Sequence, residues 1–161
     1  MSTALSYNDE DWYVNVVEPL PDCPSIEAAY DIATKLTEHV NWRSSDFPKK
    51  VKFAFVGDTK EPAATGDVYK ARLGLFIMKL TVIETMSTQE KMTWTTCAEG
   101  FCGLMRSHNC FSFFVKDGTI YGKAQEFNLK LSRGSFLLPA KSHIENEHKT
   151  MFEELNALFK K

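Results

Sequence analysis

The sequence contains no long apolar run and no excess of charge of one sign. No stretch of its 161 residues approaches the roughly 18 consecutive apolar residues that a membrane-spanning helix needs. Lysine and arginine number 19 against 21 aspartate and glutamate, which gives a net charge of -2. Without a cationic excess, no broad electrostatic attraction to nucleic acid or to anionic membranes is expected, and without a long apolar run no membrane insertion is expected. The polar, acidic start of the chain carries no secretion signal, so the expected location is cytoplasmic.

The sequence also lacks the cysteine spacing of a metal site. Cys23, Cys97, Cys102 and Cys110 form no CxxC pair, and no histidine lies near them at zinc-ligand spacing. This scatter is typical of reduced thiols, although Cys97 and Cys102 could meet across a turn. We therefore expect neither a metal ion nor another cofactor.

The middle of the chain has no helical pattern, which disfavours a βαβ arrangement. After a short strand near residues 12–18, turn residues separate a series of period-2 segments, at 51–55, 67–73, 76–86, 91–97, 104–115 and 119–131. Helical spacing predicts a Ser25-capped helix that ends near residues 41–45, and a last helix from about Pro139 to Lys160. The chain is thus predicted to be a single α+β domain over residues 1–161, with an antiparallel sheet of six or seven strands.

The dipeptide Asp117-Gly118 fixes the register of one hairpin, because it favours a two-residue type I′ turn. Such a turn places Asn109 opposite Glu126, on the same face as Phe111. This face is apolar toward the turn and is assigned to the interior, whereas His108 falls on the outer face. An interior Glu126 is costly unless it is hydrogen-bonded, paired or protonated.

A histidine interrupts the apolar stripe of the last helix. His148 lies four residues from both Ile144 and Phe152 and should therefore point toward the sheet. A carboxylate and an imidazole that face one cavity could move protons on a bound ketone or enol. The alternative is that Glu126 lies in water at a cavity mouth and that His148 is a satisfied core histidine.

The order of strand, helical segment, antiparallel meander and long C-terminal helix resembles the helix-grip fold of the START and birch-pollen-allergen superfamily, also called SRPBCC. The matching landmarks are residues 25–46 with Trp42, Gly66-Asp67, Val82 to Glu84, Met92-Thr93-Trp94, and Asp117-Gly118-Thr119 followed by Glu126-Phe127. The resemblance implies a curved sheet around the last helix, with a cavity for lipids, polyketides, hormones or other flat apolar molecules. Its members include carriers, receptors and polyketide cyclases.

The site expected from these patterns combines three candidate catalytic residues with a set of contact residues. The catalytic candidates are Glu126, His148 and Asn109. The residues expected to contact a ligand are Phe53, Phe55, Tyr69, Trp94, Ser107, Phe111, Phe113, Asn128, Met151 and Phe152. Ordinary core packing is the alternative role for the apolar members of this set. The charged side chains Lys70, Arg72 and Lys79 should point outward.

Two functions follow from this site, and the sequence does not choose between them. One is an enzyme of secondary metabolism, of cyclase, dehydratase or isomerase type, that acts on a polyketide-like or aromatic substrate. The other is a carrier or sensor of an apolar metabolite, in which the polar groups only orient the ligand. A third possibility is a partner-binding domain similar to chaperone-associated members of the superfamily, but no surface motif in the sequence supports it.

Overall fold

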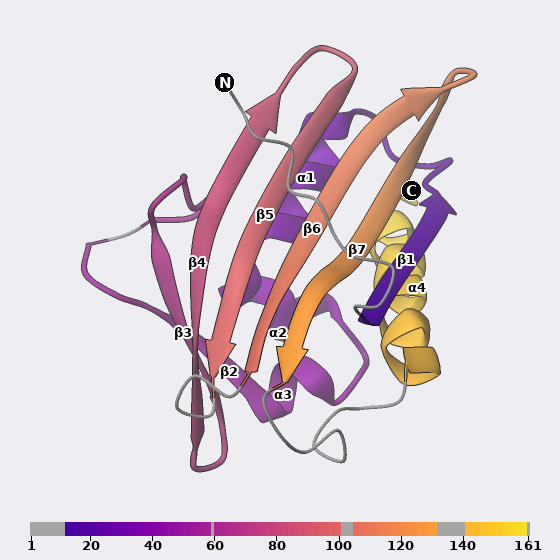
Figure 1. Ribbon diagram of the computed structural model, residues 1–161. Helices are drawn as coiled ribbons and strands as arrows, with labels where there is room; N and C mark the ends of the chain where they lie inside the picture. The colour runs from indigo at the N-terminus through magenta and orange to yellow at the C-terminus, as the bar shows by residue number, and fades with distance from the viewer. Residues whose placement is uncertain (1–11, 59, 101–104, 132–140, 161) are drawn as a thin grey trace.

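Seven antiparallel strands form one curved sheet in the computed structural model, which describes residues 12–58, 60–100, 105–131 and 141–160. The sheet order is β1-β7-β6-β5-β4-β3-β2, so the chain forms a continuous meander from β2 to β7 and β1 adds at the β7 edge (Figure 1). The strands are β1 Trp12–Pro19, β2 Val51–Phe55, β3 Val68–Leu73, β4 Phe76–Ser87, β5 Lys91–Gly100, β6 Met105–Lys116 and β7 Thr119–Leu131.

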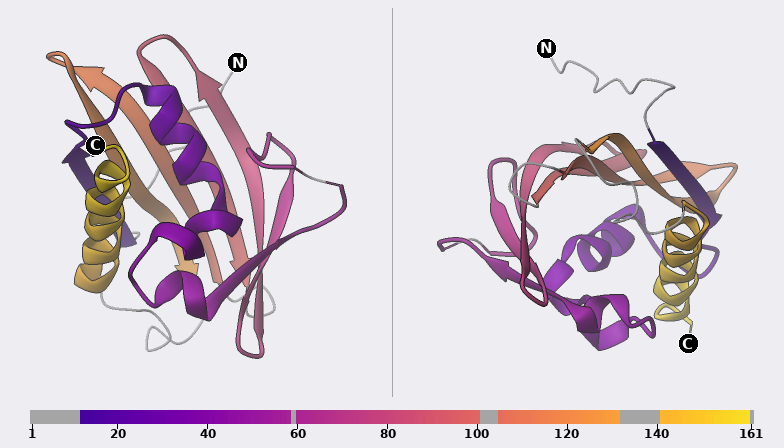
Figure 2. Two further views of the ribbon diagram at one scale, coloured as in Figure 1. Left: turned by 180° about the vertical axis from the view of Figure 1, so that it is seen from behind. Right: turned by 60° about the horizontal axis from the view of Figure 1, so that its bottom comes forward.

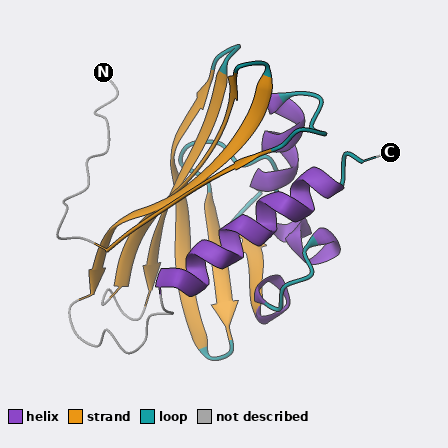
Figure 3. Ribbon diagram, turned by 90° about the vertical axis from the view of Figure 1, so that its right-hand side faces the viewer, coloured by secondary structure: helices purple, strands orange, loops and turns teal. Residues whose placement is uncertain are grey.

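The helices lie on the concave side of this sheet. They are α1 Ile26–Thr34, the 3-10 turn η1 Leu36–Glu38, α2 His39–Trp42, α3 Phe47–Lys50 and α4 Lys141–Ala157. Helix α1 lies against β5 and β6, and α4 packs on β1 at the edge of the sheet. Figure 2 shows the sheet curling around α1 to α3, and Figure 3 shows α4 running obliquely along the open side. The last helix therefore shares the concave face with α1.

The predicted hairpin register is confirmed over most of its length. Asp117 and Gly118 have φ angles of 51° and 76°, as a type I′ turn requires. Asn109 is the Cα partner of Glu126, and Phe111 is the partner of Ala124. A register shift between Arg106 and His108 then interrupts the ladder near its far end. This irregularity changes the expected pairing beyond His108, because one extra residue displaces all later partners.

The helical segment after β1 ends at Trp42, within the predicted limits, and is divided into α1, η1 and α2. Ser25 caps α1 as expected, because its hydroxyl accepts a hydrogen bond from the backbone N–H of Ala28 at 3.1 Å. The helix ends at Thr34, and η1 and α2 continue the chain in another direction. The four-residue helix α3 was not predicted, because proline usually interrupts a helix. Pro48 instead occupies an early helical position, where its missing N–H is not needed.

Two clusters of buried side chains form the core. One joins β1, α1 and α4 to the sheet and includes Val14, Ala29 and Phe152. The other lies over β2 to β5 and includes Tyr69 and Trp94. Phe111 and Tyr30 pack against both clusters and so connect them.

The Phe152 side chain of α4 reaches the backbone of β7 at Gly122. A Cβ on this glycine would lie 2.5 Å from Cε1 of Phe152, which is closer than real Cβ contacts allow. The Phe152 ring therefore occupies the space that a side chain at position 122 would need. The ring is fully buried and meets Phe113 edge-on, with 6.1 Å between ring centroids. This contact sets the position of α4 along β7.

We expect Gly122→Ala to destabilise the fold by about 1–3 kcal/mol, the usual cost of overpacking a core. Phe152→Ala should cost about 3–5 kcal/mol, because the whole ring is buried. The two sites should not be additive: in a Phe152→Leu background, Gly122→Ala should cost clearly less than in the natural chain. Urea unfolding of the natural chain, Gly122→Ala, Phe152→Leu and the double variant measures this coupling. An equal cost of Gly122→Ala in both backgrounds would contradict the contact.

A buried histidine in α2 makes stability depend on pH. His39 Nε2 donates to the backbone oxygen of Ala33 at 2.7 Å, and its ring packs on Trp42. Burial lowers the pKa of His39 from 6.5 to about 4, and the charge of Arg43 acts in the same direction. Because the folded pKa is depressed, protons bind the unfolded chain more readily. The stability from neutral His39 is present above pH 6.5 and is lost as the pH falls toward about 4.

We therefore expect His39 to account for a loss of about 2 kcal/mol in the free energy of unfolding between about pH 7.5 and about pH 5. His39→Gln should remove this slope, whatever its effect on stability at pH 7.5. His143→Gln is the matched control, because His143 is exposed on α4. Equal pH slopes in His39→Gln and the natural chain would show that His39 is not the titrating group.

Candidate functional site

A carboxylate and an imidazole meet on the concave side of the sheet. Nε2 of His148 on α4 lies 3.3 Å from Oε1 of Glu126 on β7. Glu126 lies two residues from Ala124 and four from Gly122 along β7, so it shares their face. Because both of these residues are buried, Glu126 points inward. The two side chains remain 17% and 15% exposed, so both are reachable from solvent. The second oxygen of Glu126 has no partner among the described residues.

A row of aromatic rings leads across the sheet to this pair. Trp94 on β5 stacks on Phe111 of β6 with 6.2 Å between centroids and 8° between ring planes. Phe111 in turn meets the His148 ring edge-on at 6.0 Å. On the far side, Tyr69 of β3 contacts Trp94 edge-on at 6.5 Å and Phe55 of β2 at 4.8 Å. Strands β2, β3, β5 and β6 thus supply one aromatic wall that ends at a polar pair.

Asn109 lies beside the pair but bonds elsewhere. It is the Cα partner of Glu126, yet its side-chain amide donates to the hydroxyl of Ser107 at 3.4 Å. Asn109 is half-buried and Ser107 is buried. The carboxylate of Glu126 is therefore paired with the helix histidine, and the amide forms a separate polar contact on β6.

The predicted contact residues divide into two groups. Phe53, Phe55 and Phe111 are inward-facing and half-buried, so each keeps surface that a ligand could touch. The rest of the described aromatic and sulfur-containing side chains in the set belong to the packed core: Tyr69, Trp94, Phe113, Met151 and Phe152. The side chain of Asn128 lies outside the described residues. His108 is on the outer face, as the register predicted, and is buried there against Phe127.

A second polar group, which sequence reasoning missed, lies at the other end of the aromatic wall. The hydroxyl of Tyr69 and one carboxylate oxygen of Glu61 are buried, and neither has a hydrogen-bond partner among the residues that the structure describes. The other Glu61 oxygen accepts from the N–H and the hydroxyl of Thr37. Burial raises the pKa of Glu61, and burial followed by the charge of Glu61 raises the pKa of Tyr69. Glu61 escaped prediction because its Glu-Pro sequence is typical of an exposed turn.

Two residues that follow α2, Arg43 and Ser44, bond to side chains of α4. Nη2 of Arg43 lies 3.1 Å from a carboxylate oxygen of Glu147, and the arginine is buried. Two helical turns further along α4, Glu154 accepts hydrogen bonds from both the N–H and the hydroxyl of Ser44. Both glutamates lie seven residues apart on α4, on the same helix face. These bonds hold α2 beside the helix that carries His148.

The described residues contain no group of three His, Cys, Asp or Glu side chains that could hold a metal ion. They also contain no helix that is both long and apolar enough to span a bilayer.

Comparison with known proteins identifies the architecture. No protein-family model and no curated protein matches the sequence. Among solved structures, the hypothetical protein jhp0584 from Helicobacter pylori superposes with a TM-score of 0.77 at 9% identity, over 99% of each chain. A START superfamily protein from Mycobacterium smegmatis matches with a TM-score of 0.59 at 10% identity, over 91% of this chain and 98% of that one.

The chain has the helix-grip fold. A third match is a norcoclaurine synthase point mutant from Thalictrum flavum, solved with a transition-state analogue, at a TM-score of 0.56 and 10% identity over 94% and 97% of the two chains. The resemblance stated from the sequence is therefore confirmed for the fold. Because this fold carries unrelated functions, the activity has to be argued from the site.

Proposed function

We propose that the concave face binds a flat, largely apolar ligand of polyketide-like or aromatic type, and that Glu126 and His148 move protons on it. The observation that carries this proposal is their contact at 3.3 Å beside the aromatic wall. The half-buried Phe111 ring favours a flat molecule, because flat rings stack on one another with the least loss of contact. The reaction would be an isomerisation, dehydration or cyclisation that proceeds through an enol.

The two groups can divide the acid and base roles. The free oxygen of the Glu126 carboxylate takes a proton from a carbon next to a ligand carbonyl, and the C–H electron pair becomes the double bond of an enolate. A protonated His148 gives its proton to the enolate oxygen. Glu126 then gives its proton to a different carbon, and the enol oxygen returns its proton to His148, which re-forms the carbonyl, restores both side chains and completes an isomerisation. Proton transfer of this kind contributes about 10²–10⁴-fold to a rate.

A carrier remains the second candidate, because Glu126 and His148 also satisfy each other. In that case the pair would anchor a polar ligand group without reacting. The same variants separate the two functions, since loss of an anchor changes affinity and loss of a general base changes turnover.

We expect Glu126→Gln to slow proton exchange on the ligand by about 10²-fold or more, with little loss of affinity. The ligand is first identified by mass spectrometry of small molecules that co-purify with the protein. Purified protein is then incubated with it in D₂O, and deuterium incorporation is followed by mass. Affinity is measured separately, by displacement of the dye anilinonaphthalene sulfonate.

Glu153→Gln is the matched control, because Glu153 is exposed on the same helix as His148. A change in affinity alone would identify a carrier. If Glu126→Gln and His148→Phe alter neither exchange nor affinity, the concave pair has no functional role.

A further inference from the structure

The outer face of the sheet carries a concentrated cationic surface on strands β2 to β4. Lys52 lies directly opposite Arg72, and Lys70 lies directly opposite Lys79. All four side chains are exposed, and none of them makes an ion pair within the part of the chain that the structure describes. Like charges opposite one another destabilise a sheet. Their grouping here therefore favours a partner that supplies negative charge.

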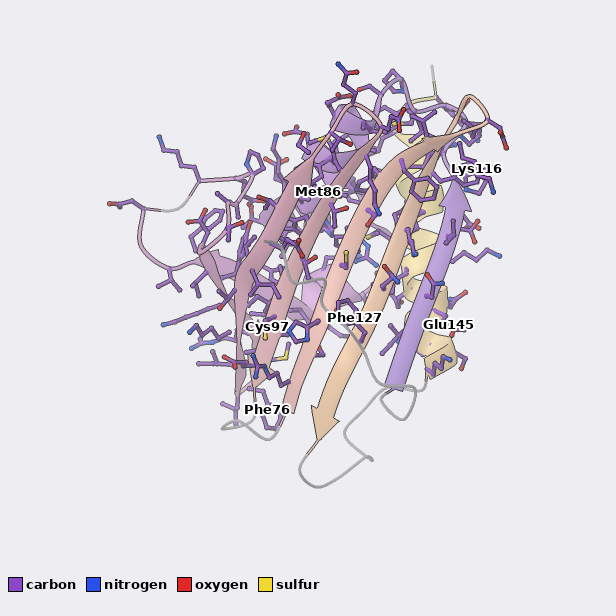
Figure 4. All side chains as sticks on the ribbon, turned by 45° about the horizontal axis from the view of Figure 1, so that its top comes forward. Phe76, Met86, Cys97, Lys116, Phe127 and Glu145 are labelled. Atoms are coloured by element: carbon purple, nitrogen blue, oxygen red, sulfur yellow. The ribbon has the colours of Figure 1, made fainter. Side chains whose placement is uncertain are left out.

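An apolar tip projects from the same strands. The β3–β4 hairpin turns at Gly74 and Leu75, and Leu75 is 99% exposed. Phe76 and Ile77 follow and keep about half of their surface exposed, at 52% and 50%. Ile77 is the Cα partner of Arg72, so it lies on the cationic face. Figures 1 and 4 show this hairpin at the lower end of the sheet, with Phe76 far from Lys116 at the upper end.

The cationic face is also hollowed. A groove of about 560 Å³ lies over β3 to β5, with Lys70 and Lys79 at its sides and apolar surface from Val68 and Ile77. Val56, Glu99 and Gly100 complete its lining. The Glu99 carboxylate lies 3.7 Å from Nε of Arg106, which offsets its charge. Two lysines and several apolar side chains in one lining suit a group that has a phosphate head and an apolar body.

We infer that this surface docks on an anionic lipid bilayer. The exposed Leu75 side chain enters the boundary between headgroups and acyl chains, and the cations of the outer face contact lipid phosphates. Each basic residue near an anionic membrane contributes about a fivefold gain in binding, and an apolar side chain adds burial that a soluble polyanion cannot offer. The tip therefore selects a bilayer over RNA or an acidic protein.

The small net charge does not oppose this docking. Helix α4, on the concave side of the sheet, carries four acidic residues: Glu145, Glu147, Glu153 and Glu154. At physiological salt, charges more than about 8 Å apart are largely screened from each other, so a membrane responds to the nearby face. The inference does not depend on what the concave face binds, and ligand affinity and vesicle binding can fail independently.

The test is sedimentation of the full chain with vesicles of phosphatidylcholine, with and without about 30% phosphatidylserine. We expect binding to the anionic vesicles only, and weaker binding at high salt. Lys70→Glu combined with Lys79→Glu should lower the partition coefficient by about 25-fold or more, at about fivefold for each cation lost. Lys116→Glu combined with Lys149→Glu changes the net charge equally, away from this face, and should have a much smaller effect.

The tip is tested by Leu75→Ser, which should weaken vesicle binding several-fold, against Val115→Ser at the opposite end of the sheet. In Leu75→Trp, the added fluorescence should shift to the blue when anionic vesicles are present. Circular dichroism and thermal melts check that each variant folds. Equal losses in the two double lysine variants, equal binding to neutral vesicles, or no binding at millimolar lipid would overturn the inference. So would tight binding to RNA that Leu75→Ser leaves unchanged.

Discussion

The contact of the Phe152 ring with Gly122 is the one on which the candidate site depends. With hydrogen in place of a side chain, β7 lets the Phe152 ring lie against its backbone. That ring sets the height of the helix along the strand, and one turn toward the start of α4 the same face presents His148. Glu126 lies four residues along β7 on the inward face. The pairing of the two polar groups is thus a consequence of apolar packing between Gly122 and Phe152.

The concave face combines fixed and accessible parts. Tyr69 and Trp94 are fully buried and hold the aromatic wall rigid, whereas Phe111 and Phe55 keep surface that a ligand can contact. Polar groups lie at both ends of the wall: Glu126 with His148 at one end, and Tyr69 with Glu61 at the other. A ligand that lies along the wall would meet hydrogen-bonding groups at either end, which favours an elongated molecule over a compact one.

The sequence predicted those parts of the site that follow from strict periodicity. The Asp117-Gly118 turn fixes a hairpin register, and that register places Glu126 inward without any other information. The helical stripe likewise aims His148 at the sheet. Their mutual contact could not be predicted, because it depends on how far α4 slides along β7. Asn109 lies opposite Glu126, as the register predicted. Cross-strand pairing does not fix which side-chain atoms bond, and the amide of Asn109 bonds Ser107 on its own strand.

Irregular segments limited the prediction in a different way. The shift between Arg106 and His108 has no residue signature in the sequence, since neither glycine nor proline marks it. Glu61 reads as a turn residue, and only the packing of its loop over η1 brings its carboxylate into the core. The cations of β3 and β4, Lys70, Arg72 and Lys79, were correctly expected to point outward, but the alignment of Arg72 with Lys52 depends on the pairing of β2 with β3. The inner faces of the same strands, with buried Val51, Tyr69 and Ala71, offset the repulsion of that pairing. A stable apolar inner face is therefore what permits a cationic outer face on these strands.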